Sequence, residues 1–343
     1  MNKEDKPVII WLGVGCFLIA AMVIVGGITR LTHSGLSIVE WNLLMGSIPP
    51  LNKEEWMEVF DKYKSTPEFI LVNYNFSLEE FKSIYWWEYI HRMLGRFIGL
   101  VFIIPFGYLM FRKRLSNSLI RKLLIVFALG SLQAFLGWYM VKSGLVRDPT
   151  VSHYRLASHL IIALALYGYI LVLVFDLIFP TSGQASAVNK PLRKVTVLLL
   201  IITFVQFIYG AFMSGLKAGK VYNTFPKMGS QWIADSVGFS YKKDGLISLM
   251  ENLASVQFIH RYLAVFILIL VLIIWRKSRN ISTYHIKIGA NLLLIIVIAQ
   301  FLLGVMALLF AVPVLLGVLH QFGALVFLTA IIYYWHNVKS FQN

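Results

Sequence analysis

Eight long apolar stretches constrain the fold of this chain more than any other feature of its sequence. They cover residues 8–28, 85–111, 119–141, 154–179, 194–216, 253–275, 286–310 and 313–335. A bilayer core of about 30 Å is crossed by roughly 20 helical residues, so each stretch is long enough to span it. Only 14% of the 343 residues are charged, and a soluble core of this size could not hide so much apolar surface. The sequence therefore predicts an all-α integral membrane protein with eight transmembrane helices.

Basic residues concentrate in the short connections after the second, fourth and sixth spans. They are Arg112, Lys113, Arg114, Arg121, Lys122, Lys190, Arg193, Lys194, Arg276, Lys277, Arg279 and Lys287. Short loops rich in Lys and Arg stay in the cytoplasm, so we expect cytoplasmic N- and C-termini in the cell inner membrane. Segments 29–84 and 217–252 are then external. The same clustering accounts for the net charge of +15, so we expect membrane lipid and no nucleic acid as a partner.

Motifs recur at matching places in the two halves of the chain. Glu88-Tyr89-Ile90-His91-Arg92 in the second span matches Gln257-Phe258-Ile259-His260-Arg261 in the sixth. The pattern Gln-x-x-x-Gly occurs at 133–137, 206–210 and 300–304. The repeat predicts two tandem four-helix bundles, residues 1–180 and 190–343, related by an axis along the membrane normal.

Four of the eight histidines lie inside apolar spans. His91, His159, His260 and His320 occupy the second, fourth, sixth and eighth spans, about 10 Å below the outer surface at 1.5 Å per residue. Two imidazoles that face each other across a bundle are suited to bind one heme iron. A single buried histidine is as often a locally hydrogen-bonded residue, but four at one depth in a duplicated unit favour heme. The lone Cys16 excludes an internal disulfide and disfavours a thiolate metal site.

Charged residues near these histidines are the other candidates for a functional role. Arginines pair with carboxylates through two donors, so the candidates to bind heme propionates are Arg92, Arg96, Arg155 and Arg261. The alternative for each is interfacial snorkelling. Glu88 lies one turn before His91, where the second half has Gln257, which makes it a candidate for proton handling. Its alternative is a simple ion pair with Arg92. We assign no role to His33 and His153.

Taken together, the motifs cover essentially the whole chain and identify a resemblance. The chain resembles the heme A synthase family, in the subgroup that includes mitochondrial and many Gram-negative enzymes. The resemblance rests on segments 26–37, Glu40-Trp41, 46–52, 86–92, 140–145, 152–160, Phe225-Pro226-Lys227-Met228-Gly229, 258–261 and His320-Gln321.

The resemblance implies a reaction and a set of roles. The family oxidises the C8 methyl of heme O to a formyl group by successive hydroxylations, giving heme A for terminal oxidases. It implies a heme b cofactor on His260 and His320, a substrate heme on His91 and His159, and Glu88 as the essential acid. Expected partners are heme O, heme O synthase, an electron donor that no motif identifies, and a possible second copy of the chain.

Two other functions fit the histidine pattern. A di-heme b-type membrane electron carrier would use the same four ligands, but it gives no reason for an acid in one half only. A heme transporter or chaperone would bind heme without chemistry and would need no reductant.

Overall fold

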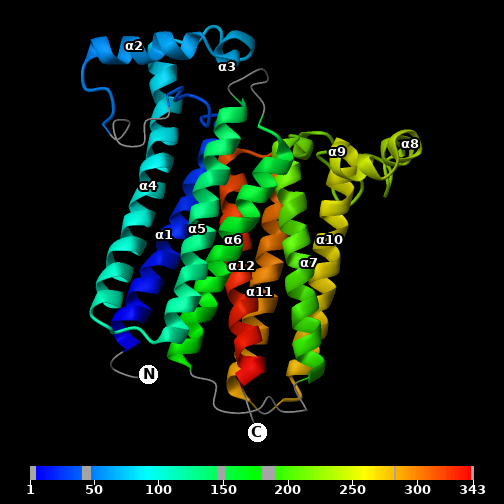
Figure 1. The fold of residues 1–343 in the computed structure, drawn as a ribbon. Coiled ribbons are helices and arrows are strands. Elements are labelled where there is room, and N and C mark those ends of the chain that lie inside the picture. Colours follow the sequence, from blue (N-terminus) through cyan, green and yellow to red (C-terminus); the bar gives the residue numbers. More distant parts are fainter. Residues whose placement is uncertain (1–4, 41–47, 145–150, 180–189, 282, 341–343) are drawn as a thin grey trace. The chain divides into compact units, whose positions relative to one another are not determined.

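The computed structural model describes residues 5–40, 48–144, 151–179, 190–281 and 283–340, and these residues form helices without a β-strand (Figure 1). Trp41, Gly46 and Leu145 of the motifs above lie outside the described residues. The helices are α1 (Lys6–Leu31), α2 (Lys53–Lys64), α3 (Pro67–Leu71), α4 (Leu78–Phe111), α5 (Asn117–Gly144), α6 (His153–Ile178), α7 (Lys190–Gly215), η4 (Ala218–Lys220), α8 (Asp235–Asp244), η5 (Gly245–Ile247), α9 (Ser248–Glu251), α10 (Leu253–Ser278), α11 (Tyr284–Leu309) and α12 (Val314–Ser340).

All eight predicted spans are confirmed as helices long and apolar enough to cross a bilayer. The largest difference is at the start of α4, which begins at Leu78 and not near residue 85. Ser77 accepts a hydrogen bond from the amide of Glu80, whose side chain bonds back to the amide of Ser77. This capping box starts the helix in a polar stretch that hydropathy alone does not mark as helical.

The chain divides into two compact units, Met1–Cys16 with Leu160–Asn343, and Phe17–His159. The division passes through α1 and α6, because each of these helices contributes residues to both units. The two tandem bundles with their boundary near residue 180 come from the sequence repeat and stay a prediction.

The unit that contains residues 160–343 has its core between α7, α10, α11 and α12. Its fully covered side chains include Leu199, Val271, Ile274, Leu293 and Ile331. In lipid, helices associate through close packing and hydrogen bonds and not through the hydrophobic effect. Ser278 and Tyr334 supply one such bond, with 2.7 Å between their buried hydroxyl oxygens. This core holds α10 and α12, and with them His260 and His320, in a fixed position.

The segment between α1 and α4 forms a small folded layer with its own aromatic core. Trp56, Phe60 and Tyr63 on α2 pack against Phe81 and Tyr85 on α4, with the Trp56 and Tyr85 ring centres 5.0 Å apart. Such edge-on aromatic contacts stabilise a small core by more than their buried area alone. The apolar face of α2 is thus turned onto α4.

One polar cluster is buried beneath this aromatic layer. The Tyr63 hydroxyl donates to the Glu68 carboxylate at 3.3 Å, and the Asn73 amide donates to the Tyr63 oxygen at 2.8 Å. Burial raises the pKa of Glu68 to about 8, and the charge of Glu88 raises it as well, while the Tyr63 hydrogen bond acts in the opposite direction. Glu68 is therefore held mainly as the neutral acid near pH 7.

We predict that the stability of the folded protein falls as the pH rises from about 5 to 8. The native state binds a proton at Glu68 up to pH about 8, whereas an exposed carboxyl releases it near pH 4.5. Since the native state then holds more protons than the unfolded state, raising the pH through this window favours unfolding. Glu68→Gln should flatten the change in Tm, measured by thermal unfolding in detergent between pH 5 and 9.

The matched control is Glu54→Gln, because Glu54 lies exposed on the neighbouring helix α2. It should leave the pH dependence of Tm as in the wild type. An equal pH dependence in the Glu68→Gln and wild-type proteins would contradict the assignment.

Candidate functional site

Each of the four predicted ligand histidines lies against a glycine of the preceding long helix. A Cβ atom built on Gly26 would lie 3.2 Å from His91 Nε2, and on Gly137, Gly210 and Gly304 it would lie 3.1, 3.4 and 2.7 Å from Cε1 of His159, His260 and His320. These distances leave little or no room for a larger side chain. The glycines therefore allow each imidazole ring to lie close to the backbone of the neighbouring helix.

His260 and His320 form one pair of facing rings. Their ring centres are 6.5 Å apart and the ring planes are inclined by 73°. Two imidazoles on opposite sides of one metal ion have centres about 6 Å apart, given metal–nitrogen bonds of about 2 Å. The Nδ1 atoms of both rings are buried without a hydrogen-bond partner, which is uncommon unless another group engages the ring. The pair therefore fits axial binding of a heme iron.

His91 and His159 both belong to the unit Phe17–His159. The Nδ1 atom of His159 is also buried and unpaired. No group of three or more His, Cys, Asp or Glu side chains suited to a metal ion occurs in the described part of the chain, which disfavours a caged metal ion at either pair.

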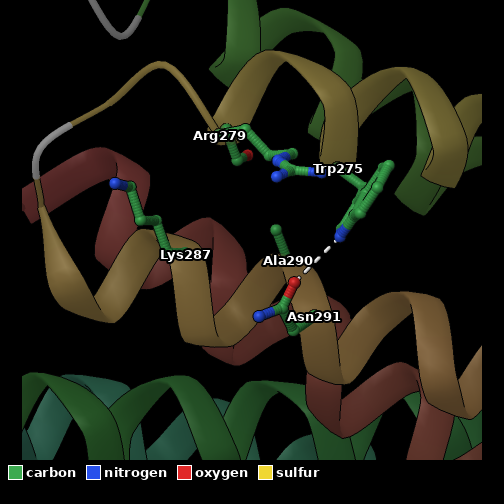
Figure 2. A pocket seen from close by; sticks show the side chains of 6 residues that line it. Trp275, Arg279, Lys287, Ala290 and Asn291 are labelled. Atoms are coloured by element: carbon green, nitrogen blue, oxygen red, sulfur yellow. Dashed lines mark hydrogen bonds between the residues drawn. The ribbon is translucent and has the colours of Figure 1, made fainter.

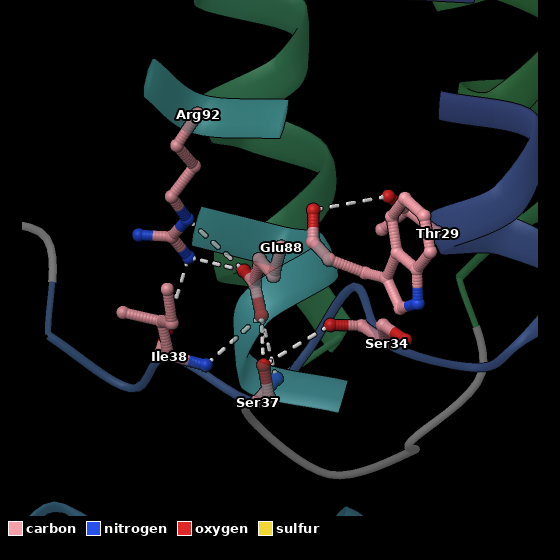
Figure 3. A network of polar contacts seen from close by, with 7 residues as sticks. Thr29, Ser34, Ser37, Ile38, Glu88 and Arg92 are labelled. Carbon is pink, nitrogen blue, oxygen red and sulfur yellow. Dashed lines mark hydrogen bonds and ion pairs between the residues drawn. The ribbon is translucent and has the colours of Figure 1, made fainter. Parts of the chain in front are cut away.

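Glu88 lies one turn before His91 on α4 and is almost completely buried, with 2% of its surface exposed. Figure 3 shows its carboxylate between Arg92 and the segment that follows α1. One oxygen accepts from Arg92 Nε at 3.0 Å and Nη2 at 2.5 Å. The other accepts from the backbone amides of Ser37 and Ile38 at 2.7 and 2.9 Å. The Ser37 hydroxyl lies 2.7 Å from this second oxygen and 3.1 Å from the Ser34 carbonyl oxygen.

The predicted ion pair of Glu88 with Arg92 is thus present, and it belongs to a wider network. Arg92 Nη2 also donates to the Ile38 carbonyl at 3.0 Å, so the segment that follows α1 is attached to α4 from two sides. Thr29 adds a contact of 3.4 Å to the Trp87 carbonyl oxygen. A buried carboxylate of this kind is stable only when both oxygens are bonded, and here they are.

The second half repeats the arrangement without the charge of the acid. Gln257 donates its amide to the Tyr222 carbonyl at 3.2 Å, in the loop that follows α7. Arg261 donates to the carbonyls of Tyr222, Thr224 and Lys227 at 2.7, 2.8 and 3.2 Å. In each half, the residues flanking the predicted ligand histidine therefore attach a loop to the helix that carries this histidine.

The other two predicted propionate ligands have contacts of a different kind. Arg96 donates to the sulfur of Met93 at 3.2 Å, and the Arg155 guanidinium lies over the Tyr139 ring, 4.6 Å from its centre. All four arginines therefore contact the protein itself. Their role toward heme propionates stays a prediction.

Three site residues were not found from the sequence. Ile38 binds Glu88 through its backbone amide, which leaves no side-chain signal, and Ser37 binds it through both its amide and its hydroxyl. Ser37 and Gly26 lay in a motif that was read only as part of the resemblance. His336 was given no role, but it is 2% exposed, with its Nε2 3.3 Å from Asp176 Oδ1.

A separate pocket lies between α10 and α11, as Figure 2 shows, and it contains none of the predicted site residues. Trp275 donates its indole N–H to Asn291 at 2.8 Å, and the Arg279 guanidinium lies 5.1 Å from a Trp275 ring centre. Arg279 and Lys287 belong to the basic cluster predicted to be cytoplasmic. The pocket therefore marks the basic ends of two helices and not the histidine sites.

The chain is similar to known proteins over nearly its whole length. The family model described as cytochrome oxidase assembly protein matches residues 9–332. The chain is similar to the heme A synthase of Flavobacterium psychrophilum, with 44% identity over 98% of this chain and 100% of the relative. It is similar to the heme A synthases of Nitrosospira multiformis, 44% identical over 98% and 94% of the two chains, and of Wolbachia pipientis wMel, 40% identical over 96% and 92%.

We predict that Gly304→Ala lowers heme retention. The added Cβ would lie 2.7 Å from His320 Cε1, so the ring or the helix must shift. Overpacking of this kind costs about 1–3 kcal/mol. The heme absorbance per mole of purified protein measures the effect.

Gly130→Ala on α5 is the control, because a Cβ there meets nothing within 4 Å. It should retain heme as the wild type does. If both variants retain wild-type heme, the close packing of His320 on Gly304 is not needed for binding.

Proposed function

The chain belongs to the heme A synthase family of cytochrome oxidase assembly proteins, and from this membership we propose that it oxidises the C8 methyl of heme O to a formyl group. Two successive hydroxylations of the methyl give a geminal diol, which loses water to give the formyl group of heme A. The product serves terminal oxidases, and an electron donor takes part. We further propose heme b on His260 and His320 and the substrate heme on His91 and His159.

One observation supports this proposal more than any other. Two histidine pairs are built on the same glycine-backed plan, and only the pair of the Phe17–His159 unit has a buried carboxylate one turn away. In the corresponding position the other pair has the neutral Gln257. A chain that only carried electrons would need no proton-holding group beside one histidine pair and not the other. A reaction at the heme held beside Glu88 would account for the difference.

Heme b held by His260 and His320 would supply electron transfer, and the residues of the chain would supply position and protons. Glu88 and Arg92 attach the segment from Ser34 to Ile38 to α4 and so exclude water from the outer end of the substrate site. The Ser37 hydroxyl can bond either to Glu88 or to the Ser34 carbonyl, and so provides a proton position between the carboxylate and the external segment. Glu88 then holds or releases a proton through Ser37 as the substrate methyl is oxidised.

The eight spans make the chain a multi-pass membrane protein. The basic clusters at the ends of α4, α10 and the start of α7 support an inner-membrane orientation with both termini in the cytoplasm. In that orientation the histidine pairs lie nearer the external face, which suits a product that is handed to an oxidase in the same membrane.

The di-heme electron carrier has one observation in its favour. Both oxygens of Glu88 are engaged by Arg92 and by backbone amides, as they would be in a purely structural ion pair. Identification of the hemes extracted from the purified protein separates the two functions, because a carrier makes no heme A.

We predict that Glu88→Gln, in protein produced together with a heme O synthase, lowers heme A formation by about a hundredfold, the scale of general acid–base catalysis. Glutamine keeps the size and the acceptor oxygen but removes the charge and the proton. Hemes are extracted from the purified protein and identified by chromatography with mass detection.

The matched control is Gln257→Glu, which places a carboxyl at the corresponding position of the other half. It should not restore heme A when combined with Glu88→Gln. Full heme A output from Glu88→Gln would exclude the proton role, and heme B alone in the wild-type protein despite available heme O would identify a carrier.

A further inference from the structure

Three of the four ligand histidines have a glutamine beside them. Each glutamine lies one turn before the glycine that backs the histidine, so it faces the same neighbouring helix. Gln133 Nε2 lies 3.1 Å from His159 Nε2, and Gln206 Nε2 lies 3.4 Å from His260 Nε2 and donates to the His260 carbonyl at 3.1 Å. Gln300 Nε2 donates to the His320 carbonyl at 2.9 Å. The repeated Gln-x-x-x-Gly motif therefore attaches a ligand histidine to the preceding helix.

The fourth histidine lacks this contact. Gly26 backs His91, and the residue one turn before it is Met22. The Met22 methyl lies 3.3 Å from the position of a Cβ on Gly95 of α4, so the side chain fills the space between α1 and α4. A thioether donates no hydrogen bond and is a weak acceptor. His91 is thus held by packing alone from the α1 side.

The amide groups of the three glutamines each have an unused acceptor atom, and each of the three histidines has an unused ring nitrogen. The Oε1 atoms of Gln133, Gln206 and Gln300 are buried without a partner, as are the Nδ1 atoms of the three histidines. A histidine that binds a metal through one nitrogen carries a hydrogen on the other, and an acceptor for this hydrogen fixes the ring and strengthens the ligand. An unpaired buried amide oxygen costs free energy, so a pairing of oxygen and ring N–H is favoured once the ring is engaged.

We propose, resting on the proposed function, that Gln133, Gln206 and Gln300 are positioning residues for three heme ligands, and that Met22 leaves His91 as the exchangeable ligand. A resident cofactor is best served by two fixed ligands, His260 and His320. A substrate must be taken up and released at every turnover, and one fixed ligand with one exchangeable ligand allows this.

The packing of the ligand helices agrees with the proposal. In α4, which carries His91, the protein buries only 6% of the 18-residue apolar stretch of the helix. The corresponding share in α10, which carries His260, is 22%. The exchangeable ligand therefore lies on the helix with less support from its neighbours, and its release disturbs fewer contacts. The Glu88 and Arg92 network holds the outer end of α4 meanwhile.

The test uses the full chain purified in detergent, loaded with hemin, and mixed with excess apomyoglobin as heme acceptor. The rate of heme transfer is followed by absorbance, and His159→Ala identifies the phase that belongs to the substrate site. Met22→Gln, nearly equal in length, should slow that phase roughly tenfold, the lower range for a residue that orients a metal ligand. Met22→Leu is the matched control and should leave the rate unchanged.

Two further variants keep the inference testable if Met22→Gln does not fold. Gln133→Met should speed release from the substrate site, and Gln206→Met should speed release from the other site and shift its midpoint potential, each by removing one amide. Equal transfer rates for wild type, Met22→Gln and Gln133→Met would overturn the inference. Absence of any bound hemin in the wild type would instead overturn the proposed function, because these rates do not depend on turnover.

Discussion

The packing of each imidazole against a glycine of the neighbouring helix is the contact on which the rest of the structure depends. A glycine inside a helix costs about 1 kcal/mol relative to alanine in water. In lipid the backbone hydrogen bonds have no competitor, so a helix tolerates this loss. What the chain gains is a ring that lies directly on the backbone of the next helix, as at Gly304 and His320. Ring position, helix separation and the space between facing rings are then set together.

The loops after α1 and α7 depend on the same helices. On α4, Glu88 and Arg92 bind the segment after α1, and on α10, Gln257 and Arg261 bind the loop after α7. Both sets of residues flank a predicted ligand histidine by one turn or less. A movement of α4 or α10 therefore moves the attached loop, and the attached loop restricts the helix. The position of the histidine and the position of the loop are coupled in each half by the same geometry.

The spans and the histidine pattern could be read from the sequence, because hydropathy and a two-fold repeat are properties of residue types and spacing. All eight spans are helices, and the ring centres of His260 and His320 lie 6.5 Å apart, while their role as heme ligands stays a prediction. The contacts of Glu88 with the backbone amides of Ser37 and Ile38 could not be predicted, since backbone amides carry no sequence signal. The early start of α4 was missed because a capping box, and not hydropathy, determines it.

Two differences between the histidine sites of the two halves are single side chains at matching positions. Glu88 replaces an amide with a charge, and Met22 stands where the repeat has an amide such as Gln206. Met22 lies on α1, which packs against His91, and Glu88 lies on α4, which carries it. Both differences make the two histidine sites unequal. Two histidine pairs built on one repeat can thus serve as one site for a resident heme and one site for a transient heme without a change of fold. The shared helices fix where a heme would bind. The side chains of Met22 and Glu88 determine whether the site holds a resident heme or a transient one.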